Sequence, residues 1–174
     1  MPGPAHSAGA LSARTLALAA VLIADAAKRA RGEWDGAAEA QEQALALARR
    51  ALALGTINEE AYRDAVAALS GDLPPYHAQT RDHLLGDMLD RAAEAPLALA
   101  TTAADLAVLG ARVGEHAPDQ GAADAVAAAA IAVGVARATT HLVAVNLATL
   151  EDDPRLYQAR QEVRRAAGAL PDDL

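Results

Sequence analysis

Residues 121–150 read GAADAVAAAAIAVGVARATTHLVAVNLATL, an almost unbroken run of small and aliphatic residues. A helix that is apolar on every side is either a membrane span or the central helix of an all-α core. A membrane span of this length would place Arg137 near the middle of the bilayer, at a cost of about 2.5–3.5 kcal/mol. The run also contains more Ala than Leu, and no cluster of Lys or Arg flanks it. We therefore predict that it forms the central helix of an all-α core.

The polar residues inside this run need partners or a purpose, because burial of an unpaired ionisable group is costly. Arg137 and His141 are spaced i, i+4 and share a helix face. We expect hydrogen bonds in the core or at a subunit interface to satisfy them. Asp124 and Asn146 would lie about 33 Å apart along one helix, so they cannot share one site within it. Asp124 either opens onto a cleft or complements the N-terminus of the helix.

Composition narrows the function classes. The chain has 174 residues and fits a single domain, residues 1–174, with a proper core. It has no Cys, which excludes disulfides, a thiol nucleophile and a Cys-ligated zinc site. Its net charge of −8 argues against binding to nucleic acid or to an anionic membrane. Aromatic side chains are few, and Tyr62 and Tyr76 are the plausible rings on which a flat ligand could stack.

The spacing of Gly and Pro residues predicts the helices, and no strand pattern appears. We expect an all-α, up-and-down bundle of about five long, kinked helices. Gly55 is a possible break in the second helix, and Pro96 should bend the third by removing a backbone donor. The helices are expected over residues 9–30, 36–70, 76–115 and 121–150, and over a short final segment that starts near Pro154.

The N-terminal region raises the question of secretion. Leu16 to Ala24 is a short apolar run, and Ala24-Asp25-Ala26 resembles a signal-peptidase site. However, the region before it carries only Arg14 as a charge, so we interpret the run as part of the first core helix. The expected location is the cytoplasm.

The second half of the chain contains three short segments that resemble the motifs of a known family. Ala95-Pro96-Leu97 matches a Val-Pro-Leu kink, and Ala123-Asp124-Ala125 matches a Ser-Asp-Ala opening of the long helix. Val145-Asn146-Leu147 matches an Ile-Asn-Leu segment near the end of that helix. The order of these pieces resembles the cyclodeaminase/cyclohydrolase family, which comprises the all-α domain of formiminotransferase-cyclodeaminase and the stand-alone methenyltetrahydrofolate cyclohydrolases.

The first half of the chain departs from the family pattern at two places. Pro4-Ala5-His6-Ser7-Ala8 stands where the family has a Gly-rich start, so a loop that could approach a ligand closely is lost. Asn58-Glu59-Glu60-Ala61-Tyr62 stands where the family has Asp-Ala-Glu-Ala-Tyr/Phe. Asn58 therefore replaces the leading catalytic candidate of the family, and an amide cannot act as a general base at neutral pH.

The resemblance implies chemistry on reduced folates. Cyclodeaminases close 5-formiminotetrahydrofolate to 5,10-methenyltetrahydrofolate with loss of ammonia, and cyclohydrolases open that ring with water. No cofactor is implied, because a tetrahydrofolate derivative would be the substrate. The resemblance gives as catalytic candidates Asp124, Asn58 and Glu60. The substrate-binding candidates are His6, Ser7, Tyr62, Tyr76, His77 and Asn146.

Alternative functions remain open. The scaffold could serve a cyclase or related enzyme that acts on a non-folate biosynthetic intermediate, or a non-catalytic binding or structural dimer. Whether the chain is an enzyme therefore stays undecided at this stage. The pair His77 and His83 lacks a third clustered ligand, so no metal site is expected. The Ala-rich surfaces and the resemblance both predict a homodimer with the long helix at or near the interface.

Overall fold

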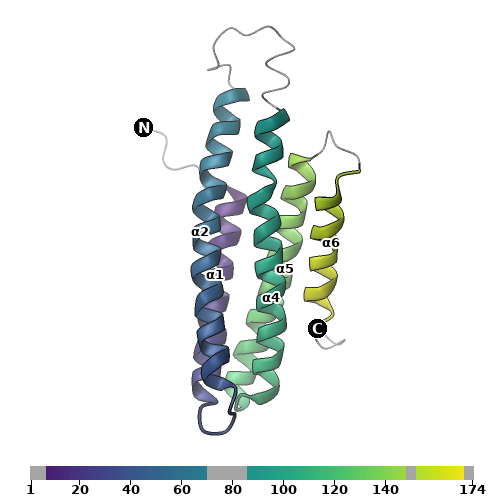
Figure 1. Ribbon diagram of the computed structural model, residues 1–174. Helices are drawn as coiled ribbons and strands as arrows, with labels where there is room; N and C mark the ends of the chain where they lie inside the picture. Colours follow the sequence, from purple (N-terminus) through teal and green to yellow (C-terminus); the bar gives the residue numbers. More distant parts are fainter. Residues whose placement is uncertain (1–6, 70–85, 148–151, 171–174) are drawn as a thin grey trace, which may run out of the picture.

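The computed structural model describes residues 7–69, 86–147 and 152–170. In this part of the chain all regular structure is helical (Figure 1). The helices are α1 (Ala8–Arg29), α2 (Ala37–Leu69), α4 (Glu94–His116), α5 (Asp119–Asn146) and α6 (Pro154–Ala167), and residues 86–92 form a further helical segment before α4.

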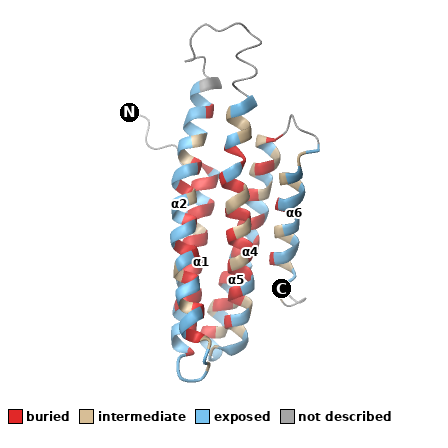
Figure 2. Cartoon of the chain, in the orientation of Figure 1, coloured by how far each residue is buried: buried red, intermediate tan, exposed pale blue. Residues whose placement is uncertain are grey.

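Four long helices, α1, α2, α4 and α5, run up and down beside one another, and α6 packs against α4 and α5 (Figure 1). The predicted all-α, up-and-down architecture is confirmed. The bundle is held together mainly by small side chains, because most of its buried hydrophobic residues are alanines. Figure 2 shows the buried positions of α1, α4 and α5 facing the interior of the bundle. The larger core side chains are Leu16, Ile23, Leu99, Leu106, Val113 and Val143.

Close packing of the helices explains one feature that the sequence alone does not show. The possible break at Gly55 is wrong, since α2 continues through this residue as a helix. A Cβ atom at Gly55 would lie 2.8 Å from the Cβ of Ala13, so the glycine allows α1 and α2 to approach each other. Gly32, with a φ of 95°, is the turn residue between the same two helices.

The predicted bend near Pro96 takes the form of an interruption three residues earlier. The helical segment 86–92 ends before Ala93, and α4 begins at Glu94. Pro96 sits in the first turn of α4, where its missing N–H costs least. The two segments are therefore separated near the point where Pro96, which has no N–H, cannot donate the usual helical hydrogen bond.

The sequence predicted that residues 121–150 form a helix buried on every side, but α5 is only partly buried. α5 is buried on the side that faces α1 and α4, but its outer stripe is exposed and contains Ala127, Ile131, Gly134 and Val145. Among the described residues, three stretches are long and apolar enough, by length and composition alone, to cross a membrane: Ala8–Arg29, Gly86–His116 and Asp119–Asn146. About half of each apolar window is buried against the other helices of the bundle.

The N-terminus of α6 is fixed by a charged cluster. Asp153 is the N-cap residue, and its carboxylate accepts hydrogen bonds from the backbone N–H of Arg155 at 2.8 Å and from Arg155 Nη2 at 2.6 Å. Arg155 also pairs with Asp90, in the helical segment 86–92. The cluster therefore ties α6 to the region just before α4.

This cluster predicts a pH dependence. The side-chain and backbone hydrogen bonds from Arg155 lower the pKa of Asp153 to about 2. An Asp in the unfolded chain has a pKa of about 3.9. The contribution of the Asp153 carboxylate to the free energy of unfolding is therefore complete above that pH and is lost as the pH falls toward ~2. The variant Asp153→Asn keeps a capping side chain but removes the charge. The difference in melting temperature between native protein and this variant should shrink between pH 4 and pH 2, as followed by circular dichroism. A difference that stays constant across this range would contradict the assignment.

Candidate functional site

A pocket of about 290 Å³ opens between α1, α2, α4 and α5, at the end of the bundle where α1 begins. Its size is near the lower end of the range for small-molecule sites, which is roughly 300–1,000 Å³. Its polar side chains come from Ser7, Asn58, Tyr62 and Asn146, and the remaining wall is apolar. The full lining consists of Ser7, Ala8, Gly9, Asn58, Tyr62, Ala65, Ala92, Pro96, Leu142, Val145 and Asn146.

Ser7 lines this pocket at the start of α1. It is the N-cap residue, and its Oγ accepts the backbone N–H of Ala10 at 3.2 Å. The same Oγ accepts a hydrogen bond from Asn58 Nδ2, also at 3.2 Å. Ser7 thus links the first turn of α1 to the middle of α2.

Asn58 is 7% exposed, and the close approach of α1 to its side chain requires a glycine. A Cβ atom at Gly9 would lie 2.3–2.5 Å from the amide atoms of Asn58. Sequence reasoning missed Gly9, although a glycine two residues after a capping serine was a usable signal for a close contact.

Asn146 reaches the pocket from the last turn of α5. Its Nδ2 donates a hydrogen bond to the carbonyl oxygen of Ala92 at 2.8 Å. Tyr62, one turn beyond Asn58 on α2, is half exposed and contributes its ring to the wall.

The other two catalytic candidates lie elsewhere in the chain. Asp124 is near the start of α5, where Arg29 Nη1 donates to its Oδ2 at 2.8 Å. Asn146 is about 33 Å further along the same helix, so Asp124 is outside the pocket of its own chain. Glu60 is exposed on α2, two residues and roughly 200° of helix rotation from Asn58. The structure therefore brings only Asn58 of the three to the pocket.

Three of the substrate-binding candidates, His6, Tyr76 and His77, lie outside the described residues. His83, considered above as a metal ligand, lies outside them too. Within the described ranges, no group of three His, Asp or Glu side chains is close enough to hold a metal ion.

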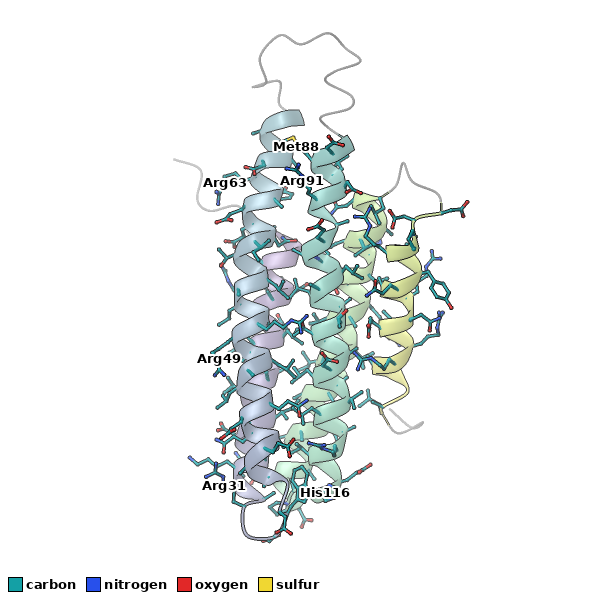
Figure 3. The ribbon with its side chains drawn as sticks, in the orientation of Figure 1. Arg31, Arg49, Arg63, Met88, Arg91 and His116 are labelled. Carbon is teal, nitrogen blue, oxygen red and sulfur yellow. The ribbon has the colours of Figure 1, made fainter. Side chains whose placement is uncertain are left out.

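Arg137 and His141 are exposed on the outer stripe of α5, so the expectation that the core buries them is wrong. Neither makes an ion pair with another residue of the described part of the chain. Of the two alternatives, the subunit interface is the one that this position allows. Figure 3 shows other basic side chains, Arg49 and Arg63, pointing outward from α2.

The pocket is electrically neutral. None of its lining residues carries a carboxylate, an imidazole or a basic group. It offers hydroxyl and amide groups set in an apolar wall, an arrangement suited to a neutral heterocycle with hydrogen-bonding edges. Asn58 presents an amide to this pocket, and an amide cannot act as a general base at neutral pH.

Comparison with solved structures shows the same fold. The crystal structure of formiminotetrahydrofolate cyclodeaminase from Thermotoga maritima superposes with a TM-score of 0.73 at 20% sequence identity. The match covers 98% of this chain and 90% of that one. Comparison with curated proteins gave no match. The sequence profile described as formiminotransferase-cyclodeaminase matches residues 2–165. The chain therefore belongs to the formiminotransferase-cyclodeaminase family.

Proposed function

We propose that the pocket binds a tetrahydrofolate derivative as its small-molecule ligand, on a cyclodeaminase scaffold that no longer has an aspartate at position 58. The observation that carries this proposal is the convergence of Ser7, Asn58, Tyr62 and Asn146 on one pocket from three helices. These residues correspond to the family motifs at positions far apart in the sequence. Their convergence supports retention of the ligand site.

The neutral lining supports the second half of the proposal. General-base catalysis at neutral pH needs a group that can accept a proton, and an amide cannot do so. The polar side chains of the described lining are amides, a hydroxyl and a phenol, and none of them is a carboxylate or an imidazole. The native protein should therefore bind a reduced folate but show little or no cyclodeaminase or cyclohydrolase turnover.

Binding can be measured by native mass spectrometry and calorimetry with tetrahydrofolate and 5,10-methenyltetrahydrofolate. A matched pair of variants locates the site: Tyr62→Ala removes a ring from the pocket wall, whereas Tyr157→Ala removes an exposed ring on α6. We expect the first variant to lose affinity and the second to bind as the native protein does. Absence of reduced-folate binding in the native protein would reject the proposal.

A second function is favoured by the same neutral pocket. An enzyme of this scaffold could catalyse a C–N bond-forming cyclisation of a non-folate biosynthetic intermediate, where alignment of the reacting groups supplies most of the acceleration. Failure to bind reduced folates, together with binding of another neutral heterocycle in the same pocket, would favour this function.

The partner that we propose is a second copy of the chain. α1 and α5 lie side by side, and their outward surfaces expose the large side chains Leu11, Leu18, Ile131 and Val145. Small residues between them, such as Gly134, permit close approach of another helix. Arg137 and His141 on the same stripe favour a protein neighbour over lipid, because charge in a bilayer is costly.

A homodimer on this surface makes a direct prediction. Light scattering should show a dimer at micromolar concentration, and Ile131→Glu should convert it to a monomer by placing a charge in the interface. The control Ile57→Glu changes a similarly exposed isoleucine on α2 and should remain dimeric. A monomeric native protein would contradict the prediction.

A further inference from the structure

The carbonyl oxygen of Ala92 lies at the interruption before α4 and lacks its usual helical donor. In a continuous helix the N–H of residue 96 would donate to it, but residue 96 is a proline and has no N–H. Asn146 Nδ2 takes the place of that donor at 2.8 Å. A side chain of α5 thus completes the backbone hydrogen bonding of the segment before α4.

This hydrogen bond fixes which way the Asn146 amide points. A carbonyl oxygen can only accept, so the nitrogen of the amide must face Ala92 and Oδ1 must face away. Apart from this bond, the Asn146 side chain has no hydrogen bond within the described residues. Among the non-exposed residues there, Gln41 Oε1 is the one fully buried side-chain nitrogen or oxygen without a hydrogen-bond partner. Asn146 Oδ1 is therefore not fully buried and borders accessible space. Asn146 is one of the residues that line the pocket, so the pocket is accessible space on which this side chain borders.

Asn58 presents a second acceptor by the same reasoning. Its Nδ2 donates to Ser7 Oγ at 3.2 Å, which leaves Oδ1 as the free end of the amide. Ser7 Oγ already accepts two hydrogen bonds, from Asn58 and from the N–H of Ala10, so its own proton can be donated. The pocket therefore offers two carbonyl acceptors and one hydroxyl donor.

We propose that Asn146 is a specificity-determining residue, which accepts a hydrogen bond from an N–H group of the ligand and is oriented for this by the Ala92 carbonyl that Pro96 leaves without a helical donor. The complementary ligand edge carries two N–H donors beside one acceptor, as in a 2-amino-4-oxopyrimidine ring. The choice of a reduced folate as probe rests on the function proposed above, whereas the orientation of Asn146 does not.

The first experiment needs no ligand. In the native protein, the side-chain NH₂ group of Asn146 should exchange with solvent more slowly than an exposed asparagine amide, as measured by ¹⁵N-edited NMR. Pro96→Ala restores a backbone N–H that competes for the Ala92 carbonyl, so it should remove most of this protection. Pro118→Ala, at an exposed helix start on the opposite end of α4, is the control and should leave it unchanged. Unprotected Asn146 protons in the native protein, or protection unaffected by Pro96→Ala, would overturn the orienting role.

The second experiment tests specificity with tetrahydrofolate and two analogues, one with the 2-amino group replaced by methyl and one methylated at N3. Calorimetry on the native protein should give an affinity about 10–100-fold lower for at least one analogue, the effect of leaving a buried acceptor unpaired. Asn146→Leu should lower the affinity of the protein for tetrahydrofolate by a similar factor and leave its affinity for that analogue unchanged. Circular dichroism checks that this variant folds, and Pro96→Ala provides a second variant with an intact Asn146.

The outcomes separate the two proposals. If Asn146→Leu weakens tetrahydrofolate and both analogues equally, Asn146 has only a structural role and the specificity role is rejected. If the native protein binds none of the three, the folate proposal fails, while the exchange experiment still decides how Asn146 is oriented.

Discussion

We expect Asn58→Asp to raise cyclodeaminase or cyclohydrolase turnover by about 10²–10⁴-fold over the native protein, the range typical of general-base catalysis. The substitution keeps the shape of the side chain, so the narrow clearance from Gly9 is preserved. The substitution also places a carboxylate beside Ser7, and the Ser7 hydroxyl can donate a hydrogen bond to this carboxylate. The measurement is the rate of formation or loss of 5,10-methenyltetrahydrofolate by absorbance.

A matched control separates the position of the carboxylate from its presence. Asn146→Asp introduces the same group into the same pocket on the opposite wall, and it should give no comparable increase. Asn58→Ala should remain as slow as the native protein. Robust folate turnover by the native chain would reject the hypothesis that Asn58 abolished the proton chemistry, and it would direct attention to Asp124 of a neighbouring copy or to Glu60.

The second large effect concerns stability and is expected at Gly110, where α4 packs closely against α1 and α5. A Cβ atom there would lie 2.7 Å from Ile23 Cδ1, 2.9 Å from the Cβ of Ala129 and 3.0 Å from the backbone oxygen of Ala125. The last two atoms cannot move without displacing α5. Gly110→Ala should therefore destabilise the protein by about 1–3 kcal/mol, the typical cost of overpacking a core.

The control for this prediction is the same substitution on the outer stripe of α5. A Cβ at Gly134 meets nothing within 4 Å, so Gly134→Ala should stabilise the helix by about 0.5–1 kcal/mol. Urea denaturation of both variants gives the two free energies of unfolding, and light scattering separates any effect on assembly. A stabilising Gly110→Ala would show that α4 and α5 are less closely packed than the structure has them.

Much of the fold could be predicted because the chain marks its helix ends clearly. α1 and α6 begin within a residue of the expected positions. The start of α6 was predicted from the Pro in its first turn, whereas the capping role of Ser7 at the start of α1 was not predicted. Gly55 was misinterpreted because a glycine that ends a helix and a glycine that admits a neighbouring helix look the same in one sequence. The difference depends on Ala13, which is distant along the chain.

The candidate site was only partly predictable. Ser7, Asn58, Tyr62 and Asn146 were identified from the family resemblance, and the structure brings them together in one pocket. The contribution of Ala92 was missed, because its role arises from a carbonyl left without a donor and not from its side chain. Pro96 was predicted to bend the helix. Because a proline has no N–H, the carbonyl oxygen four residues earlier lacks its helical donor, and this was the available signal for the role of Ala92.

The position of the pocket at the junction of four helices has a thermodynamic consequence. Its walls come from α1, α2, α4 and α5. The pocket therefore exists only while these four helices are packed together, and a ligand in it binds the folded state alone. A ligand that binds only the folded state at 100 times its Kd adds about 2.7 kcal/mol to the free energy of unfolding. For a chain of this size, that corresponds to a rise in melting temperature of roughly 5–11 °C. A rise in the melting temperature of the protein in the presence of a candidate metabolite can therefore identify the natural ligand even if no reaction is detectable.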